Sequence, residues 1–146
     1  MKNRAKQAYM KAAETFAELS YAVRLKVGAI VVKDDRIISI GYNGMPARWD
    51  NNCENHVGFI KGTPVLNSKP EVLHAETNAI AKLARSNESG LGADMFITHA
   101  PCMDCAKLIY QSGINCVYYR HTYRDTDGIE FLEKSGVVVE HLNDIT

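Results

Sequence analysis

The spacing of apolar residues switches along the chain between a helical and a strand-like period, which predicts alternating helices and strands. The first segment has apolar residues at every third or fourth position, as on the buried face of a helix. Two apolar runs follow, and the Asp34-Asp35 pair between them predicts a hairpin turn. Helices are expected over residues 2–20, from near His74 to about Arg85, 102–112 and 126–135, and strands over 27–32, 36–42, 94–98, 114–119 and 137–142. The order α-β-β-α-β-α-β-α-β predicts an α/β protein.

The stretch from Asn43 to Pro70 shows no such period. It is rich in Gly, Pro and Asn and is therefore expected to form a long loop without regular structure. Loops of this length in compact domains are usually functional. We therefore expect this segment to contribute to function.

At 146 residues the chain is expected to form a single domain, 1–146, and its 46% hydrophobic and 23% charged residues are ordinary for a globular protein. Seventeen basic and seventeen acidic residues give formal neutrality, so the chain lacks the positive field of proteins that hold long nucleic acids. A small substrate and no polynucleotide partner are therefore expected. Residues 1–11 lack the apolar run of a leader, and no segment approaches about 18 uninterrupted apolar residues, so a cytoplasmic protein without a membrane partner is expected.

Two short motifs carry candidate chemistry. His74 and Glu76 stand in the first turn of one expected helix, and Pro101, Cys102 and Cys105 stand in the first turn of another. A catalytic zinc takes three nitrogen or sulfur ligands and leaves its fourth position to water. His74, Cys102 and Cys105 are the candidate ligands, and the positive end of a helix favours thiolate over thiol. Glu76 is the candidate catalytic residue, because its carboxylate can take a proton from the water.

Each motif alone permits other interpretations. A C-x-x-C pair can be a redox pair, half of a structural zinc site or two buried small residues, and an H-x-E can be a solvated helix start. Their combination in this order favours a catalytic zinc. The remaining cysteines, Cys53 and Cys116, are not expected to form a disulfide in a reducing compartment.

The pattern H-x-E followed by P-C-x-x-C is the signature of zinc nucleobase deaminases, and longer stretches narrow the resemblance. The chain resembles the cytidine deaminase superfamily and, within it, the deoxycytidylate (dCMP) deaminases of the short bacterial and phage type. The stretches that carry the resemblance are residues 27–29 (Val-Gly-Ala), 41–46 (Gly-Tyr-Asn-Gly-Met-Pro), 74–80 (His-Ala-Glu-Thr-Asn-Ala-Ile) and 101–106 (Pro-Cys-Met-Asp-Cys-Ala), with Tyr123. It implies a three-layer cytidine deaminase-like fold, in which helices flank a five-stranded mixed sheet.

The resemblance also implies residues that contact the substrate. Asn43 matches an asparagine that holds the sugar 3′-hydroxyl, and Arg24 or Lys26 is placed to bind the 5′-phosphate. The same positions have ordinary interpretations, as a turn residue and as solvated surface charges. The full set of expected substrate contacts is Arg24, Lys26, Gly28, Ala29, Asn43, Ala75 and Tyr123.

Enzymes of this kind are commonly homohexamers that dCTP with Mg²⁺ activates and dTTP inhibits, so a homo-oligomer, favoured as a hexamer, is expected. The effector-binding positions that the resemblance implies are Asn43, Gly44, Met45 and Pro46. Some relatives carry a second zinc, and Cys53 and His56 have the spacing of a half-site. Ser20 stands where such relatives can have a cysteine, so a free Cys53 and a surface His56 are expected instead.

The expected activity is zinc-dependent hydrolytic deamination of dCMP to dUMP and ammonia. The zinc signature alone does not separate this activity from that of tRNA adenosine deaminases or other nucleobase deaminases. A non-catalytic, zinc-containing nucleotide sensor is a further alternative. Neutral charge and the Asn-Gly-Met-Pro stretch argue against a tRNA enzyme, and Glu76 argues against a sensor, which has no need of a proton shuttle.

Overall fold

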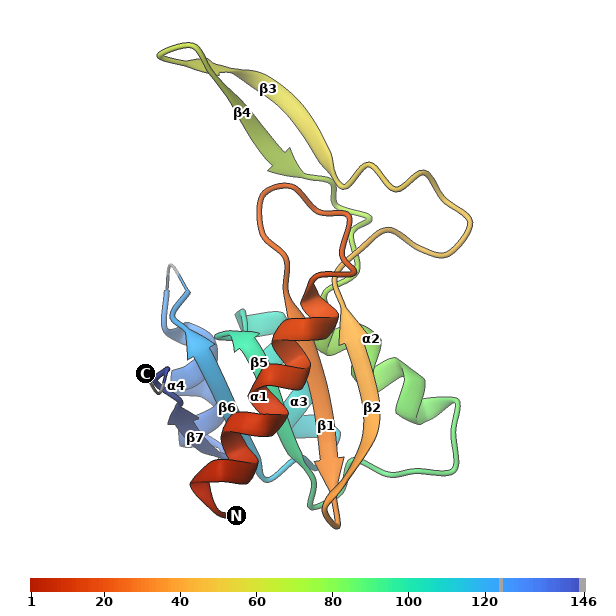
Figure 1. Ribbon diagram of the computed structural model, residues 1–146, viewed down its shortest axis with the longest axis vertical. Helices are drawn as coiled ribbons and strands as arrows, with labels where there is room; N and C mark the ends of the chain where they lie inside the picture. Colours follow the sequence, from red (N-terminus) through yellow and green to blue (C-terminus); the bar gives the residue numbers. More distant parts are fainter. Residues whose placement is uncertain (124, 145–146) are drawn as a thin grey trace.

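The computed structural model describes residues 1–123 and 125–144, and its centre is a five-stranded mixed sheet (Figure 1). The strands lie in the order β2-β1-β5-β6-β7. β1 runs antiparallel to both β2 and β5, whereas β5, β6 and β7 are parallel to one another. Their bounds are β1 Gly28–Lys33, β2 Arg36–Tyr42, β5 Asp94–His99, β6 Cys116–His121 and β7 Val138–His141.

Within the described residues, four helices cover the two faces of this sheet. Their bounds are α1 Asn3–Ala17, α2 Ala75–Ala84, α3 Met103–Gln111 and α4 Asp127–Lys134. Ala29 and Val31 of β1 join a buried cluster with residues of α2, α3 and α4, whereas Ile30 and Val32 join a second cluster with residues of α1. Successive residues of a strand point to opposite faces, so one apolar run fills both clusters. The expected three-layer α/β fold is thereby confirmed.

The turn between β1 and β2 is the one that the sequence predicts. Asp34 and Asp35 have φ angles of 51° and 57°, the left-handed conformation that a two-residue hairpin of this type requires. Aspartate tolerates this conformation better than most residues do. The turn therefore fixes the register in which β2 pairs with β1.

The segment before α2 differs from the prediction of an irregular loop, which was wrong. It contains a second, two-stranded sheet formed by β3 (Glu54–Ile60) and β4 (Thr63–Ser68), which Figure 1 shows projecting away from the main body. Lys61 and Gly62 make the connecting turn with φ angles of 50° and 79°. The Lys-Gly pair after Phe59 and Ile60 was a hairpin signal, but the frequent Gly, Pro and Asn in this segment obscured it.

Both motif helices begin close to the predicted positions. His74 is the N-cap of α2, so Glu76 lies in the first turn. Cys102 is the N-cap of α3, so Pro101 lies directly before the N-cap and not inside the first turn as expected. The capping positions leave free backbone N–H groups beside both motifs. None of the helices within the described residues is long and apolar enough to cross a membrane.

Candidate active site and metal centre

The starts of α2 and α3 bring one histidine and two cysteines together. The Nδ1 atom of His74 lies 3.3 Å from Sγ of Cys105 and 3.7 Å from Sγ of Cys102. All three candidate ligand atoms lie within 4.8 Å of one another. The two cysteines are one helical turn apart, which lets both sulfur atoms face the same point.

This arrangement fits zinc. Tetrahedral coordination with Zn–S distances of about 2.3 Å and Zn–N distances of about 2.0 Å separates the ligand atoms by roughly 3.5 to 3.8 Å. The two nitrogen–sulfur separations, 3.3 and 3.7 Å, are close to these values. Two sulfur donors and one nitrogen donor suit zinc better than magnesium or calcium. Within the described part of the chain, His74, Cys102 and Cys105 form the group of three potential ligands that lie close enough to hold a metal ion. Cys53 and His56 do not belong to this group.

The pKa values of the two thiols are shifted in opposite directions. Hydrogen bonds from Cys105 and His74 lower the pKa of Cys102, which favours its thiolate form. The same shared proton, together with burial, raises the pKa of Cys105. A metal ion that displaces this proton would complete the pair of thiolates, so the cluster is prepared for a cation.

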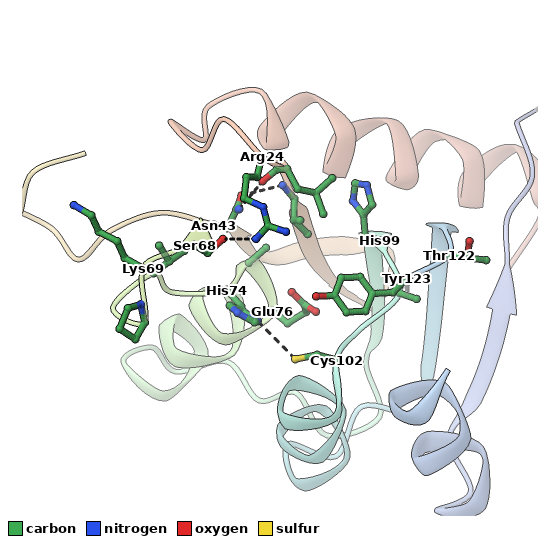
Figure 2. A pocket seen from close by; sticks show the side chains of 16 residues that line it. Arg24, Asn43, Ser68, Lys69, His74, Glu76, His99, Cys102, Thr122 and Tyr123 are labelled. Atoms are coloured by element: carbon green, nitrogen blue, oxygen red, sulfur yellow. Dashed lines mark hydrogen bonds between the residues drawn. The ribbon is translucent and has the colours of Figure 1, made fainter. Parts of the chain in front are cut away.

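Glu76 lies beside this cluster and is not one of its ligands. Its residue is only 5% exposed, and burial raises the pKa of its carboxyl group to about 7. Figure 2 shows its carboxylate at the floor of a pocket, between His74 and the hydroxyl of Tyr123. A carboxyl group that changes protonation near neutral pH suits general acid–base catalysis.

A cavity of about 500 Å³ opens above Glu76 and the metal cluster. Among the expected substrate contacts, Arg24, Asn43, Ala75 and Tyr123 line it. The structure does not bring the other three, Lys26, Gly28 and Ala29, to the cavity wall. Its lining residues are Arg24, Leu25, Val27, Asn43, Ser68, Lys69, Pro70, Val72, His74, Ala75, Glu76, His99, Ala100, Cys102, Thr122 and Tyr123.

Asn43 uses its side chain to hold the segment that precedes β1. Its Oδ1 accepts a hydrogen bond from the Val27 N–H at 2.9 Å, and its Nδ2 donates to the Leu25 carbonyl at 2.8 Å. An amide group has further donor and acceptor capacity beyond these two bonds. Asn43 can therefore contact a ligand while it fixes the cavity wall.

Gly28 and Ala29 have a packing role. A Cβ atom on Gly28 would lie 2.0 Å from the carbonyl oxygen of Ala13, so the absence of a side chain lets α1 approach β1 closely. Ala29 is fully buried in the core. The Gly28 N–H donates to Oγ1 of Thr98 at 3.1 Å, which ties β1 to the end of β5.

Sequence reasoning missed four polar residues of the cavity wall: Ser68, Lys69, His99 and Thr122. His99 stands three residues before Cys102, at the end of the strand that leads into the cysteine motif, and that position was an available signal. Burial and the neighbouring His121 lower the pKa of His99 to about 4, so it is neutral at neutral pH. The other three had no sequence signal, because they come from the hairpin and from the loop after β6.

The expected effector residues follow Asn43 along the chain. Gly44 forms an antiparallel bridge with Leu73, with the Gly44 N–H donating to the Leu73 carbonyl at 3.0 Å and the Leu73 N–H donating to the Gly44 carbonyl at 2.8 Å. Leu73 directly precedes the candidate ligand His74. Met45 and Pro46 are half-buried and lie outside the cavity lining.

A mixed sheet with a histidine, a glutamate and two cysteines at two helix starts defines a zinc-dependent deaminase domain. The family model for the cytidine and deoxycytidylate deaminase zinc-binding region matches residues 3–121, and the chain belongs to this family.

Similar proteins include enzymes named for one nucleotide. The chain is 39% identical to deoxycytidylate deaminase of Enterobacteria phage T2, over 67% of this chain and 70% of that protein. It is 34% identical to ComE operon protein 2 of Bacillus subtilis, over 93% of this chain and 70% of that protein. A crystal structure of dCMP deaminase from the cyanophage S-TIM5 in complex with dCMP and dUMP superposes with a TM-score of 0.86, at 48% identity, and covers 97% of this chain and 99% of that one.

Proposed function

We propose that this protein is a dCMP deaminase, which converts dCMP and water to dUMP and ammonia. The observation that carries the proposal is the buried Glu76 beside a cluster of His74, Cys102 and Cys105, at the floor of a cavity with Arg24 on its wall. The similarity to the cyanophage enzyme that binds dCMP and dUMP supports the choice of substrate.

The chemistry follows from the roles of these side chains. His74, Cys102 and Cys105 would hold zinc, which when bound supplies a Lewis acid that makes water nucleophilic near neutral pH. Glu76 takes a proton from the attacking water and delivers it to N3 of the pyrimidine as the oxygen adds to C4. Glu76 then moves the proton of the new C4 hydroxyl to the amine nitrogen. The C4–N4 bond breaks, ammonia leaves, and the product keeps a carbonyl at C4 and the proton on N3. Burial raises the pKa of Glu76, which helps its carboxyl group to hold a proton between the two transfers.

The remaining cavity residues fit a nucleoside monophosphate. Arg24 is the candidate for the 5′-phosphate, because a guanidinium group can bind phosphate with two parallel hydrogen bonds. Tyr123 is the candidate for contact with the base through its ring. Asn43 is the candidate for the sugar hydroxyl, through the capacity that its two internal bonds leave free.

Two alternatives lead to different expectations. A tRNA-editing enzyme would need cationic side chains spread over a wide surface, whereas this chain is formally neutral. Burial of the Glu76 carboxylate costs free energy. A nucleotide sensor, which carries out no reaction, would gain nothing from such a group beside the metal cluster.

Regulation and assembly belong to the same proposal. We propose that dCTP with Mg²⁺ activates the enzyme, that dTTP inhibits it, and that the enzyme works in the cytoplasm as a homohexamer. The bridge between Gly44 and Leu73 supports an effector site at residues 43–46, because it connects that loop directly to the residue before His74. A shift of this loop would thereby move a metal ligand.

The test is ammonia release from dCMP, CMP, dCTP, deoxycytidine and an adenosine-containing RNA hairpin, each with and without dCTP or dTTP. Preference for dCMP is the expected result, and preference for the RNA hairpin would contradict the proposal.

The phosphate assignment has its own test. Arg24→Ala should lower kcat/KM for dCMP by about 10- to 150-fold, the value of a charge-assisted contact of roughly 1.5 to 3 kcal/mol. Deoxycytidine has no phosphate and should be nearly unaffected. Lys26→Ala is the matched control, because Lys26 is an exposed cation two residues away that does not line the cavity. Equal losses on both substrates would reject Arg24 as the phosphate ligand.

A further inference from the structure

We propose that Glu54 is a positioning residue, which holds Arg24 at the cavity wall so that its guanidinium group meets the substrate phosphate. The inference rests on the proposed function, since it gives Arg24 the phosphate as its ligand. It assigns a role in substrate binding to the base of the β3–β4 hairpin.

The Glu54 side chain is buried and is bound to the backbone that carries Arg24. The residue is only 6% exposed. One of its oxygens, Oε2, accepts hydrogen bonds from the N–H groups of Val23, at 2.9 Å, and Arg24, at 3.0 Å. Hydrogen bonds to an ionised acceptor are about twice as strong as neutral ones. The position of the Arg24 backbone is therefore set by a residue 30 positions away in the sequence.

The hairpin also contacts the Arg24 side chain. Nη1 of Arg24 donates to Oγ of Ser68 at 3.2 Å, as the dashed line in Figure 2 shows. Ser68 is the β4 partner of Glu54 across the hairpin. One cross-strand pair thus holds both ends of Arg24, its backbone through Glu54 and its guanidinium group through Ser68. Lys69, the next residue after Ser68, is fixed in turn by its N–H bond to the Cys53 carbonyl at 2.8 Å.

The charge of Glu54 does not neutralise the guanidinium group. No ion pair joins Glu54 to Arg24 or to any other cation within residues 1–123 and 125–144. The carboxylate is instead compensated by the two backbone N–H groups. Among the described residues no carboxylate pairs with the Arg24 guanidinium group, so this group is available to an anionic ligand, and Ser68 constrains its direction.

A purely structural role for Glu54 predicts a different outcome from a positioning role. If the carboxylate only anchors the hairpin, its removal should lower stability and affect all substrates alike. If it positions Arg24, its removal should affect the part of binding that depends on the phosphate. A displacement of about 1 Å in a positioning group can cost on the order of 100-fold in rate, so the selective effect is measurable.

The experiment compares zinc-loaded Glu54→Ala and Glu54→Gln with the parent on dCMP and deoxycytidine. Glu54→Ala should raise KM for dCMP and lower kcat/KM about 10- to 30-fold, with less than about twofold change on deoxycytidine. Glu54→Gln retains an acceptor oxygen without the charge and should lose about threefold on dCMP. Glu71→Gln is the matched control, since Glu71 is an exposed acid between β4 and α2 that does not line the cavity. Its activity on both substrates should match that of the parent.

A double variant provides the decisive comparison. Glu54→Ala combined with Arg24→Ala should lose no more on dCMP than Arg24→Ala alone, because Glu54 acts through Arg24. Equal losses on the two substrates, or additive losses in the double variant, would overturn the positioning role. If Glu54→Ala does not fold, the selective loss in Glu54→Gln decides. A parent enzyme that does not deaminate dCMP would refute the proposed function itself, a result distinct from either of these.

Discussion

The replacement of Glu76 by glutamine tests the centre of the mechanism. Glutamine has the same shape but cannot take up and release a proton, so the variant should fold and bind zinc yet lose activity. General acid–base catalysis contributes typically 10² to 10⁴-fold. The structure indicates the upper part of this range for two reasons, the burial of the side chain and the composition of the cavity wall.

Glu76 is only 5% exposed, and no other carboxylate lines the cavity among the described residues. No neighbouring acid can therefore replace it as the proton carrier. A loss of about 10³ to 10⁴-fold in kcat corresponds to roughly 4 to 5 kcal/mol of transition-state stabilisation. This value is close to the maximum that a single proton-transfer group contributes.

The assay is steady-state ammonia release from dCMP at pH 7, with zinc content measured on the same preparations. The zinc content of the variant should equal that of the parent, and Glu71→Gln, at an exposed position five residues away, should retain full activity. A Glu76→Gln enzyme within about threefold of the parent would refute the role of Glu76 in proton transfer.

Three further predictions follow from the geometry. Cys105→Ser should reduce zinc from one ion per chain to a small fraction by metal analysis, because a serine hydroxyl is a poor replacement for a thiolate ligand. Gly28→Ala should lower the free energy of unfolding, measured in urea, by about 3 kcal/mol, because its Cβ would meet the Ala13 carbonyl oxygen at 2.0 Å. In the control Gly44→Ala no atom lies within 4 Å of the new Cβ, so the free energy of unfolding should change by less than about 0.5 kcal/mol. In the zinc-free protein burial raises the pKa of Glu76 to about 7, so the folded state retains a proton that the unfolded chain releases near pH 4.5. The free energy of unfolding is therefore highest below pH 4.5 and should fall by about 3 kcal/mol as the pH rises from 4 to 8. Glu76→Gln should remove this decline, and an unchanged pH profile of urea unfolding would show that Glu76 is not the titrating group.

The order of helices and strands around the central sheet could be predicted because it depends on local patterns. Side chains alternate along a strand and recur every third or fourth residue on a helix, so burial of one face leaves its period in the sequence. The Asp34-Asp35 turn was predictable for the same reason, since two adjacent residues determine its conformation. The β3–β4 hairpin was missed because its strands bury little and so leave a weak period.

The metal ligands could also be predicted from the sequence, although their convergence could not be derived from spacing alone. Cys102 and Cys105 are close because they share one helical turn, whereas His74 reaches them from another helix 28 residues earlier. Only the packing of α2 and α3 on the same face of the sheet brings the three together. The residue types indicated zinc, and the distances between their atoms show that one ion can be held.

The tertiary structure alone decided which candidates reach the cavity. Arg24 and Lys26 are equivalent in sequence, but Arg24 lines the cavity and Lys26 does not. Glu54 is one acid among seventeen acidic residues in the sequence, and its partners lie about 30 residues away. Such contacts join residues whose separation along the chain has no fixed relation to their distance in space. The sequence by itself therefore determined the local elements and the chemical nature of the site, whereas long-range packing determined the burial of Glu76 and the shape of the cavity above it.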